Sequence, residues 1–160
     1  MPASMDAPSA TITSWWRRLR GIPGGRWIFS KMLGTMAPYT GTMGARIVEL
    51  SPGYSKWTLR DRRRVRNHLN SIHAVALVNL AEVASGTAMI AGLQPGTRGI
   101  VRGLSIEYLK KARGTLTAEC RCTPPAVASE TDYTVEATIT DATGDVVARA
   151  SVRWLLSPRN

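Results

Sequence analysis

The chain has 160 residues, 44% hydrophobic and 20% charged, and this length and balance are those of one globular domain. Its formal net charge is +10, which favours polyanionic partners such as nucleic acid, acidic lipid or a phosphate-bearing small molecule. The two cysteines, Cys120 and Cys122, are too few for a disulfide framework or a zinc site. Alternation places them on one side of a strand, and we expect reduced thiols in a cytoplasmic protein.

The N-terminal part divides into a tail and a helical arm. Residues 1–13 are small and polar and predict a disordered tail; no basic region precedes an apolar core, as a secretory signal would require. Residues 14–43 predict a helical arm, because apolar residues recur at helical spacing on both sides of a Pro-Gly-Gly break at 23–25. Pro38 is expected to end these helices.

Two tryptophans near the start of the arm have two interpretations. Trp15 and Trp16 lie beside Arg17, Arg18 and Arg20, a composition that also suits a membrane surface. We favour packing against the domain, because the segment is short and interrupted, unlike long amphipathic membrane anchors.

A strand pair and a basic run come next in the chain. Residues 44–61 predict two strands around a Ser-Pro-Gly turn at 51–53. The basic run 60–66 is most simply a solvated face, but it directly precedes the next helix, which keeps a phosphate-binding role open. The candidates for phosphate contacts are Arg62, Arg63 and Arg64.

An almost wholly apolar run predicts a buried central helix over about 71–91, capped by Asn70 or Ser71. It carries one carboxylate, Glu82. An ionised carboxylate among apolar residues is costly unless something compensates it, so we expect Glu82 to carry the chemistry. A structural, hydrogen-bonded acid is the alternative. The stretch 74–93 is the one candidate membrane span, and its polar residues argue against transmembrane insertion.

The remainder of the chain predicts four antiparallel strands. They cover 99–109, 115–122, 133–140 and 146–156, with a hairpin between the last two. One long helix must bury its surface, and the sheet is the only partner that the chain offers. We therefore predict a single α+β domain over 44–158, in which a curved antiparallel sheet wraps around the central helix.

This order of elements resembles the hotdog fold. The spacing Asn67-x5-His73-x8-Glu82, followed by Gly86, is similar to the pattern of PaaI-like and 4-hydroxybenzoyl-CoA-thioesterase-like proteins. Across residues 14–157, including the arm, the chain resembles a hotdog subgroup catalogued as a domain of unknown function.

The resemblance implies hydrolysis of a hydrophobic, for example fatty, acyl thioester of CoA or acyl carrier protein. In such enzymes the helix acid, here Glu82, is the nucleophile or general base. The backbone N–H at the helix start, here Ala74, donates to the oxyanion. Asn67 would orient the water or the carbonyl, and His73 would hold the thioester or cap the helix. For Asn67 an ordinary turn role is the alternative.

Two departures from the pattern leave other functions open. Ala74 and Val75 replace a Gly-Gly pair, and Val101 stands where some relatives place a water-orienting Ser or Thr. Both departures bear on turnover more than on binding, so a non-catalytic acyl-CoA-binding hotdog protein is one alternative. A hotdog dehydratase is the less favoured alternative, because His68 and Glu82 have its His-x13-Glu spacing without its Pro- and Gly-containing stretch.

The same resemblance implies the partners of the chain. It implies a homodimer or homotetramer with the active site between subunits, no cofactor and no metal, and nothing in the sequence predicts a specific nucleic acid. Basic residues after the first strand beyond the helix are the best candidates to bind the CoA phosphates. These are Lys110, Lys111 and Arg113. The candidates for an acyl tunnel, equally suited to plain core, are Met32, Met36, Met89 and Ile90.

Overall fold

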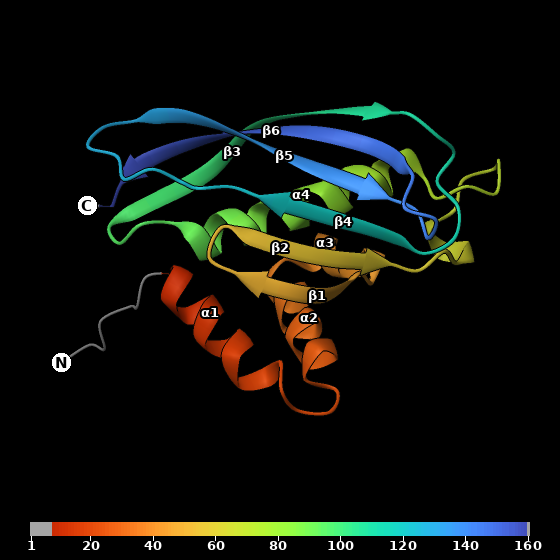
Figure 1. Ribbon diagram of the computed structural model, residues 1–160, viewed down its shortest axis with the longest axis horizontal. Coiled ribbons are helices and arrows are strands. Elements are labelled where there is room, and N and C mark those ends of the chain that lie inside the picture. Colours follow the sequence, from red (N-terminus) through yellow and green to blue (C-terminus); the bar gives the residue numbers. More distant parts are fainter. Residues whose placement is uncertain (1–7, 160) are drawn as a thin grey trace.

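The computed structural model describes residues 8–159 and shows a six-stranded antiparallel sheet curved over one long helix (Figure 1). The strand order is β1-β2-β4-β5-β6-β3, which confirms the predicted α+β architecture. The helices are α1 (Pro8–Leu19), α2 (Gly25–Met36), α3 (Pro38–Met43) and α4 (Ala74–Gly92), with a 3-10 turn at Arg63–Val65. The strands are β1 (Arg46–Ser51), β2 (Tyr54–Leu59), β3 (Thr97–Tyr108), β4 (Leu116–Arg121), β5 (Thr131–Thr140) and β6 (Val146–Pro158).

The central helix α4 is fixed to the sheet by two buried hydrogen bonds from β2. The Ser55 hydroxyl donates to the carbonyl oxygen of Ala84 (2.6 Å), and Nε1 of Trp57 donates to Oγ1 of Thr87 (3.0 Å). At its C-terminal end, a Cβ atom on Gly92 would lie 2.8 Å from the backbone nitrogen of the β1–β2 turn, so only glycine fits there without a shift. By length and composition α4 could cross a membrane, but 67% of its apolar stretch is buried, as in a core helix.

The Trp57 bond carries a testable contribution to stability. Trp57→Phe keeps an aromatic ring but removes the N–H, so we expect the free energy of unfolding to fall by at least about 1 kcal/mol. Urea unfolding measures the change. Trp27→Phe is the matched control, because Trp27 is 49% exposed, and we expect it to change stability by less than about 0.5 kcal/mol. Equal changes in the two variants would contradict the role given to the bond.

The start of α4 differs from the prediction. Neither Asn70 nor Ser71 caps the helix; His73 is the N-cap, and its Nδ1 accepts from the backbone N–H of Val75 (3.1 Å). The prediction was wrong because the preceding residues are bonded elsewhere. The backbone N–H of Ile72 donates to Ala112 (2.8 Å), and that of His73 donates to Val65 (2.8 Å), which keeps the chain extended up to His73.

The helical arm begins earlier than its sequence suggests, and its helices continue past Pro38 to Met43. Helix α1 starts at Pro8, inside the stretch predicted as a tail; residues 1–7 of that prediction lie outside the described residues. Pro38 does not end the arm but opens α3, because proline suits the first turn of a helix. Packing is confirmed for Trp16, which is buried with its ring 5.3 Å from that of Phe29 in an edge-on arrangement.

Strand β3 forms one edge of the sheet and contains a β-bulge. It pairs with β6, and the register shifts between Val101 and Gly103. The bulge breaks the expected alternation, so Ile100 is 60% exposed whereas Leu104 packs against the core. Within residues 8–159 no strand pairs with the outer side of β3, and the arm covers the opposite edge of the sheet, near β1 and β2 (Figure 1).

Candidate functional site

Glu82 lies near the middle of α4, and its side chain has no bonding partner within the described residues. Among residues 8–159 its carboxylate makes no hydrogen bond and no ion pair, and burial raises the pKa of its carboxyl group. The alternative interpretation, in which Glu82 is a structural acid held by hydrogen bonds, therefore finds no such bond among the described residues. A Cβ atom on Gly86, one turn later, would lie 4.0 Å from Oε1 of Glu82 and 3.8 Å from Cη2 of Trp154. A half-buried carboxylate without neutralising neighbours is more basic than a solvated one.

Trp154 on β6 lies on the other side of Gly86 from the helix backbone, so Gly86 has both the Trp154 ring and the Glu82 carboxylate within about 4 Å of its Cβ position. Trp154 is 4% exposed, and its Nε1 finds no hydrogen-bond partner within the described residues. On the other side of the ring lies β3: Val101 is paired with Trp154, and a Cβ atom on Gly99 would lie 3.3 Å from the indole. Buried N–H groups normally have an acceptor, so this donor is one that a bound water or substrate would satisfy. Val101 is 38% exposed and offers no hydroxyl here.

The start of α4 presents a second group of polar atoms. The backbone N–H of Ala74 has no acceptor among residues 8–159, as the oxyanion hypothesis requires. The Tyr108 hydroxyl donates to the carbonyl oxygen of Ala74 (3.2 Å), and burial raises the pKa of Tyr108. A cavity of about 370 Å³ opens beside them and is also lined by Asn67, Lys110 and Lys111. Four of the predicted site residues therefore meet here.

Asn67 and His73 both serve the backbone at this point. Oδ1 of Asn67 accepts from the backbone N–H groups of Leu69 (2.9 Å) and Ser71 (3.2 Å), which is the alternative turn role. His73 is the exposed cap of α4 and does not line the cavity. Direct substrate contacts by Asn67 and His73 stay predictions. Within the described part of the chain the side-chain nitrogen of Asn67 makes no hydrogen bond, whereas its oxygen accepts two.

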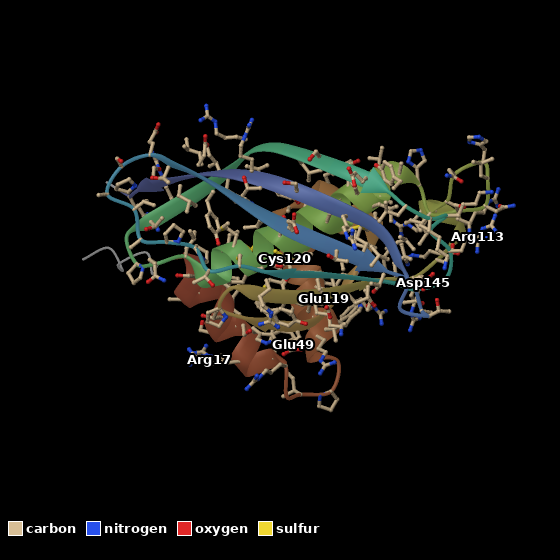
Figure 2. All side chains as sticks on the ribbon, turned by 45° about the horizontal axis from the view of Figure 1, so that its top comes forward. Arg17, Glu49, Arg113, Glu119, Cys120 and Asp145 are labelled. Carbon is tan, nitrogen blue, oxygen red and sulfur yellow. The ribbon has the colours of Figure 1, made fainter. Side chains whose placement is uncertain are left out.

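The basic residues expected to bind phosphate are differently engaged. The Lys110 ammonium lies 2.7 Å from both Asp141 and Asp145, so a phosphate would have to compete with two carboxylates. Arg113 donates weakly to the carbonyl oxygen of Leu69 (3.5 Å) and lies at the same end of the molecule as Asp145 (Figure 2). Lys111 is exposed, lines the cavity and makes no ion pair within residues 8–159. Of the three cations it is therefore the most available to bind a phosphate.

The basic run before α4 lies elsewhere. Arg62 and Arg64 donate to backbone carbonyls at the end of α3 and line a separate cavity, between the arm and the β1–β2 hairpin. Arg63 and His68 are exposed and line neither cavity. The four residues considered for an acyl tunnel line neither cavity as well: Met89 is fully buried, whereas Met36 is 66% exposed.

The predicted acid and the predicted oxyanion donor are separated within one chain. Glu82 lies eight residues after Ala74 on one helix, which corresponds to about 12 Å along the axis. Both groups must come within about 3 Å of the reacting atoms to act on one carbonyl. The two groups of residues around them are therefore treated as two candidate half-sites. The acid half-site comprises Glu82, Gly86, Val101 and Trp154, and the donor half-site comprises Asn67, Ala74, Tyr108 and Lys111.

Sequence reasoning found Glu82 and Ala74 but missed Trp154 and Tyr108. Trp154 occupies an inward position on β6, where an aromatic residue is ordinary core, and Tyr108 is half-exposed at the end of β3; only the fold brings them to the helix. No group of three or more His, Cys, Asp or Glu side chains in the described part of the chain could hold a metal ion. Cys120 and Cys122 are both free.

The chain is similar to several proteins of known structure. No curated protein sequence matches the chain. A crystal structure of a structural-genomics target is 32% identical, with a TM-score of 0.80, and the match covers 94% of this chain and 98% of that one. A Pseudomonas aeruginosa protein described as a probable thioesterase is 23% identical, with a TM-score of 0.70 and coverage of 79% and 91%. A Streptococcus mutans protein bound to acetyl CoA is 24% identical, with a TM-score of 0.61 and coverage of 71% and 90%.

These likenesses confirm the predicted hotdog fold, with its long central helix and antiparallel sheet. The family model named Domain of unknown function (DUF4442) matches residues 25–156, which include α2, α3, both half-sites and nearly all of the sheet. The chain therefore belongs to the DUF4442 family of hotdog-fold proteins.

Proposed function

We propose that the protein hydrolyses a hydrophobic acyl thioester of CoA or acyl carrier protein, with Glu82 as nucleophile or general base. The observation that carries this proposal is the half-buried carboxylate of Glu82, which has no partner among residues 8–159 and lies, like the ring of Trp154, next to Gly86. The fold is also shared with proteins described as thioesterases and with one bound to acetyl CoA.

A two-fold dimer through β3 would unite the half-sites. Val101 of the acid half-site lies toward one end of this strand, and Tyr108 of the donor half-site lies at the other. Antiparallel pairing of two β3 strands around a two-fold axis would set the Val101 end of one subunit against the Tyr108 end of its partner. The unpaired edge and the exposed side chain of Ile100 support such pairing, because open apolar edges are normally covered.

The chemistry then divides between subunits. As general base, the Glu82 carboxylate of one subunit takes a proton from the attacking water, the C–O bond forms as the C–S bond breaks, and the proton passes to the leaving thiolate. As nucleophile, it forms a mixed anhydride as the C–S bond breaks, the thiolate takes a proton from solvent, and water then hydrolyses the anhydride to regenerate the carboxylate. The Ala74 N–H of the partner chain stabilises the oxyanion that forms on the carbonyl oxygen. Lys111 and Arg113, close to the donor half-site, bind the phosphates of CoA.

Non-catalytic binding of acyl-CoA is the second candidate function. It is favoured by one observation: Val101 presents methyl groups, with 38% of its surface exposed, where a hydroxyl would help to orient water. A pocket with these residues would still hold an acyl chain and the CoA phosphates.

Hydrolysis of an acyl-CoA panel separates the two functions. We would incubate the full chain with acetyl-, hexanoyl-, palmitoyl- and benzoyl-CoA and follow loss of thioester absorbance, so that the two cysteine thiols do not interfere. We expect turnover of at least one of the longer or aryl substrates. Calorimetric binding of these thioesters without turnover would overturn the hydrolase and establish the binding protein.

A further inference from the structure

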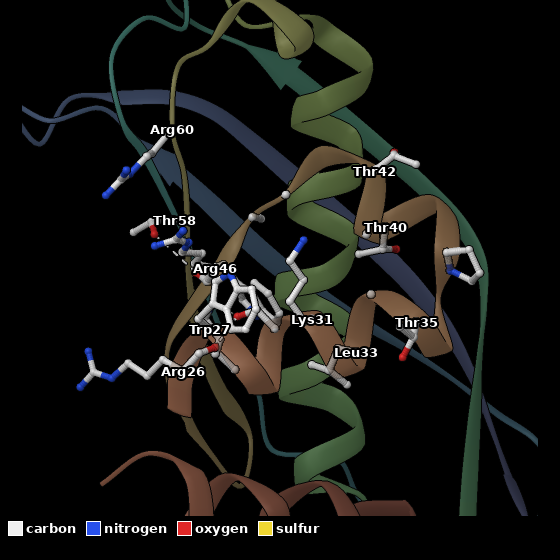
Figure 3. Close-up of a pocket in the computed structure, with 18 of the residues that line it drawn as sticks. Arg26, Trp27, Lys31, Leu33, Thr35, Thr40, Thr42, Arg46, Thr58 and Arg60 are labelled. Carbon is white, nitrogen blue, oxygen red and sulfur yellow. Dashed lines mark hydrogen bonds between the residues drawn. The ribbon is translucent and has the colours of Figure 1, made fainter. Parts of the chain in front are cut away.

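A second, larger cavity lies between the arm and the β1–β2 hairpin. Its volume is about 990 Å³, within the range of pockets that hold small organic ligands. Helices α2 and α3 form one side and the strands β1 and β2 form the other (Figure 3). None of its lining residues belongs to the acid or the donor half-site, so a ligand bound here would be independent of the proposed hydrolysis.

Specific backbone contacts build this cavity. Helices α2 and α3 approach so closely that a Cβ atom on Gly41 would lie 2.7 Å from the carbonyl oxygen of Gly34. The Arg62 guanidinium reaches across from the strand side and donates to the carbonyl oxygens of Met43 (3.0 Å) and Gly44 (3.1 Å). The Arg64 guanidinium donates in the same way to the carbonyl oxygen of Thr42 in α3 (2.6 Å). These hydrogen bonds hold the end of α3 close to the segment that follows β2, and the cavity lies between the arm and the sheet.

The charged residues that line the cavity are all cationic. Figure 3 shows Arg26, Arg46 and Arg60 on one side, with Lys31 beside Trp27. None of these four side chains forms an ion pair among residues 8–159, and the lining contains no aspartate or glutamate. Nε of Arg62, in the same wall, is buried without a hydrogen-bond partner within the described residues. Four unneutralised like charges around one cavity repel one another, and a bound anion would relieve that repulsion.

The same cavity also has apolar walls. Trp27 and Leu33 contribute from α2, and Ile47 and Trp57 contribute from β1 and β2. The Trp27 ring is 49% exposed, and the Lys31 ammonium lies 5.9 Å from its centre. A simple anion would leave these apolar surfaces in water, so the lining suits a ligand that carries both an anionic group and an apolar part.

We propose that this cavity binds an amphipathic phosphate ester. The phosphate lies among Arg26, Arg46 and Arg60, where guanidinium groups make charge-assisted hydrogen bonds to its oxygens. The apolar part of the ligand packs against Trp27 and Leu33. A lipid headgroup and a soluble nucleotide both supply this chemistry, and the test distinguishes them.

Isothermal titration calorimetry with defined probes tests the proposal on the full chain. The probes are lysophosphatidic acid below its micellar concentration, ADP, glycerol 3-phosphate and inorganic phosphate. We expect lysophosphatidic acid or ADP to bind at least about tenfold more tightly than glycerol 3-phosphate, which has the phosphate without the apolar part. The tighter of the two identifies a lipid or a nucleotide as the source. Equal affinity for all four probes, or no binding, would overturn the proposal.

A charge-matched pair of variants locates the site. Arg46→Glu with Arg60→Glu reverses two charges in the cavity, whereas Arg17→Glu with Arg18→Glu makes the same change in net charge at two exposed residues of α1; Figure 2 labels Arg17. We expect the first pair to weaken binding by at least about tenfold and the second by less than about twofold. Equal weakening would mean non-specific attraction to a basic protein and would overturn the site.

Circular dichroism would reveal whether the charge reversals unfold the arm. If they do, a second pair of variants, which changes aromatic residues instead of charges, still tests the site. Trp27→Ala removes an exposed wall of the cavity, and Tyr39→Ala removes an aromatic ring that is more exposed and does not line it. Only Trp27→Ala should weaken binding; loss in both or in neither would contradict the assignment. Acyl-CoA hydrolysis should be unchanged in all these variants, so failure of this site and failure of the proposed hydrolase remain separate results.

Discussion

Replacing Glu82 by glutamine is expected to lower the kcat for the preferred acyl-CoA by about a hundredfold or more, the scale for loss of a positioned base or nucleophile. The amide is nearly isosteric with the carboxyl group but neither attacks a carbonyl nor accepts a proton. Steady-state hydrolysis measures the change. Glu136→Gln is the matched control, because Glu136 is exposed on β5, away from both half-sites, and should retain full activity. Activity that survives Glu82→Gln would remove Glu82 from the reaction.

The same variant predicts a pH dependence with a definite sign. Burial raises the pKa of Glu82 in the folded state above its value in the unfolded chain. Hydrolysis, which needs the ionised form, should therefore decline as the pH falls through this raised pKa. Stability changes in the opposite sense: the ionised group disfavours folding above the folded-state pKa, and this penalty disappears below the unfolded-state pKa. Glu82→Gln should thus be more stable than the wild type at neutral pH, and urea unfolding should show the advantage vanishing in acid.

Replacing Ala74 by proline is expected to reduce hydrolysis by about a hundredfold to a thousandfold, the effect of losing one oxyanion donor. Proline removes only the N–H at the first position of α4, where it fits without distortion. The preceding residue, His73, has φ −63° and ψ 141°, a conformation that proline permits in its predecessor. Ala74→Gly keeps the N–H and should retain activity, so comparison of the two variants by hydrolysis and thermal melting isolates the donor. Full activity in Ala74→Pro would exclude this N–H from the reaction.

Mixing the two inactive variants tests whether each site is shared between subunits. Glu82→Gln and Ala74→Pro subunits, unfolded and refolded together in equal amounts, should recover about a quarter of wild-type activity, because half of the dimers are mixed and each holds one intact site. If the acid and the donor of one chain acted together, every site would lack one of them and no activity would return. Each variant refolded alone is the control.

The sequence predicted the order of the elements because their signals are local. The apolar run of α4 and the alternation in the strands each lie within a short stretch of chain. The start of α4 was missed because it depends on bonds from Ile72 and His73 to Ala112 and Val65, which are distant in sequence. For the same reason the motif led to Glu82 but not to Trp154, which meets Gly86 only when the sheet packs on α4.

The order of strands in the sheet also sets how this chain folds. Three of its five pairings, β1–β2, β4–β5 and β5–β6, join neighbours in sequence and can form as hairpins or simple returns of the chain. The other two, β2–β4 and β3–β6, must close loops that contain α4 with β3 or β4 with β5. Long-range closure is slow because its entropic cost comes before its contacts are made. Until it occurs, the apolar surface of α4 has no sheet to cover it, so the last step of folding is also the one that protects the chain from aggregation.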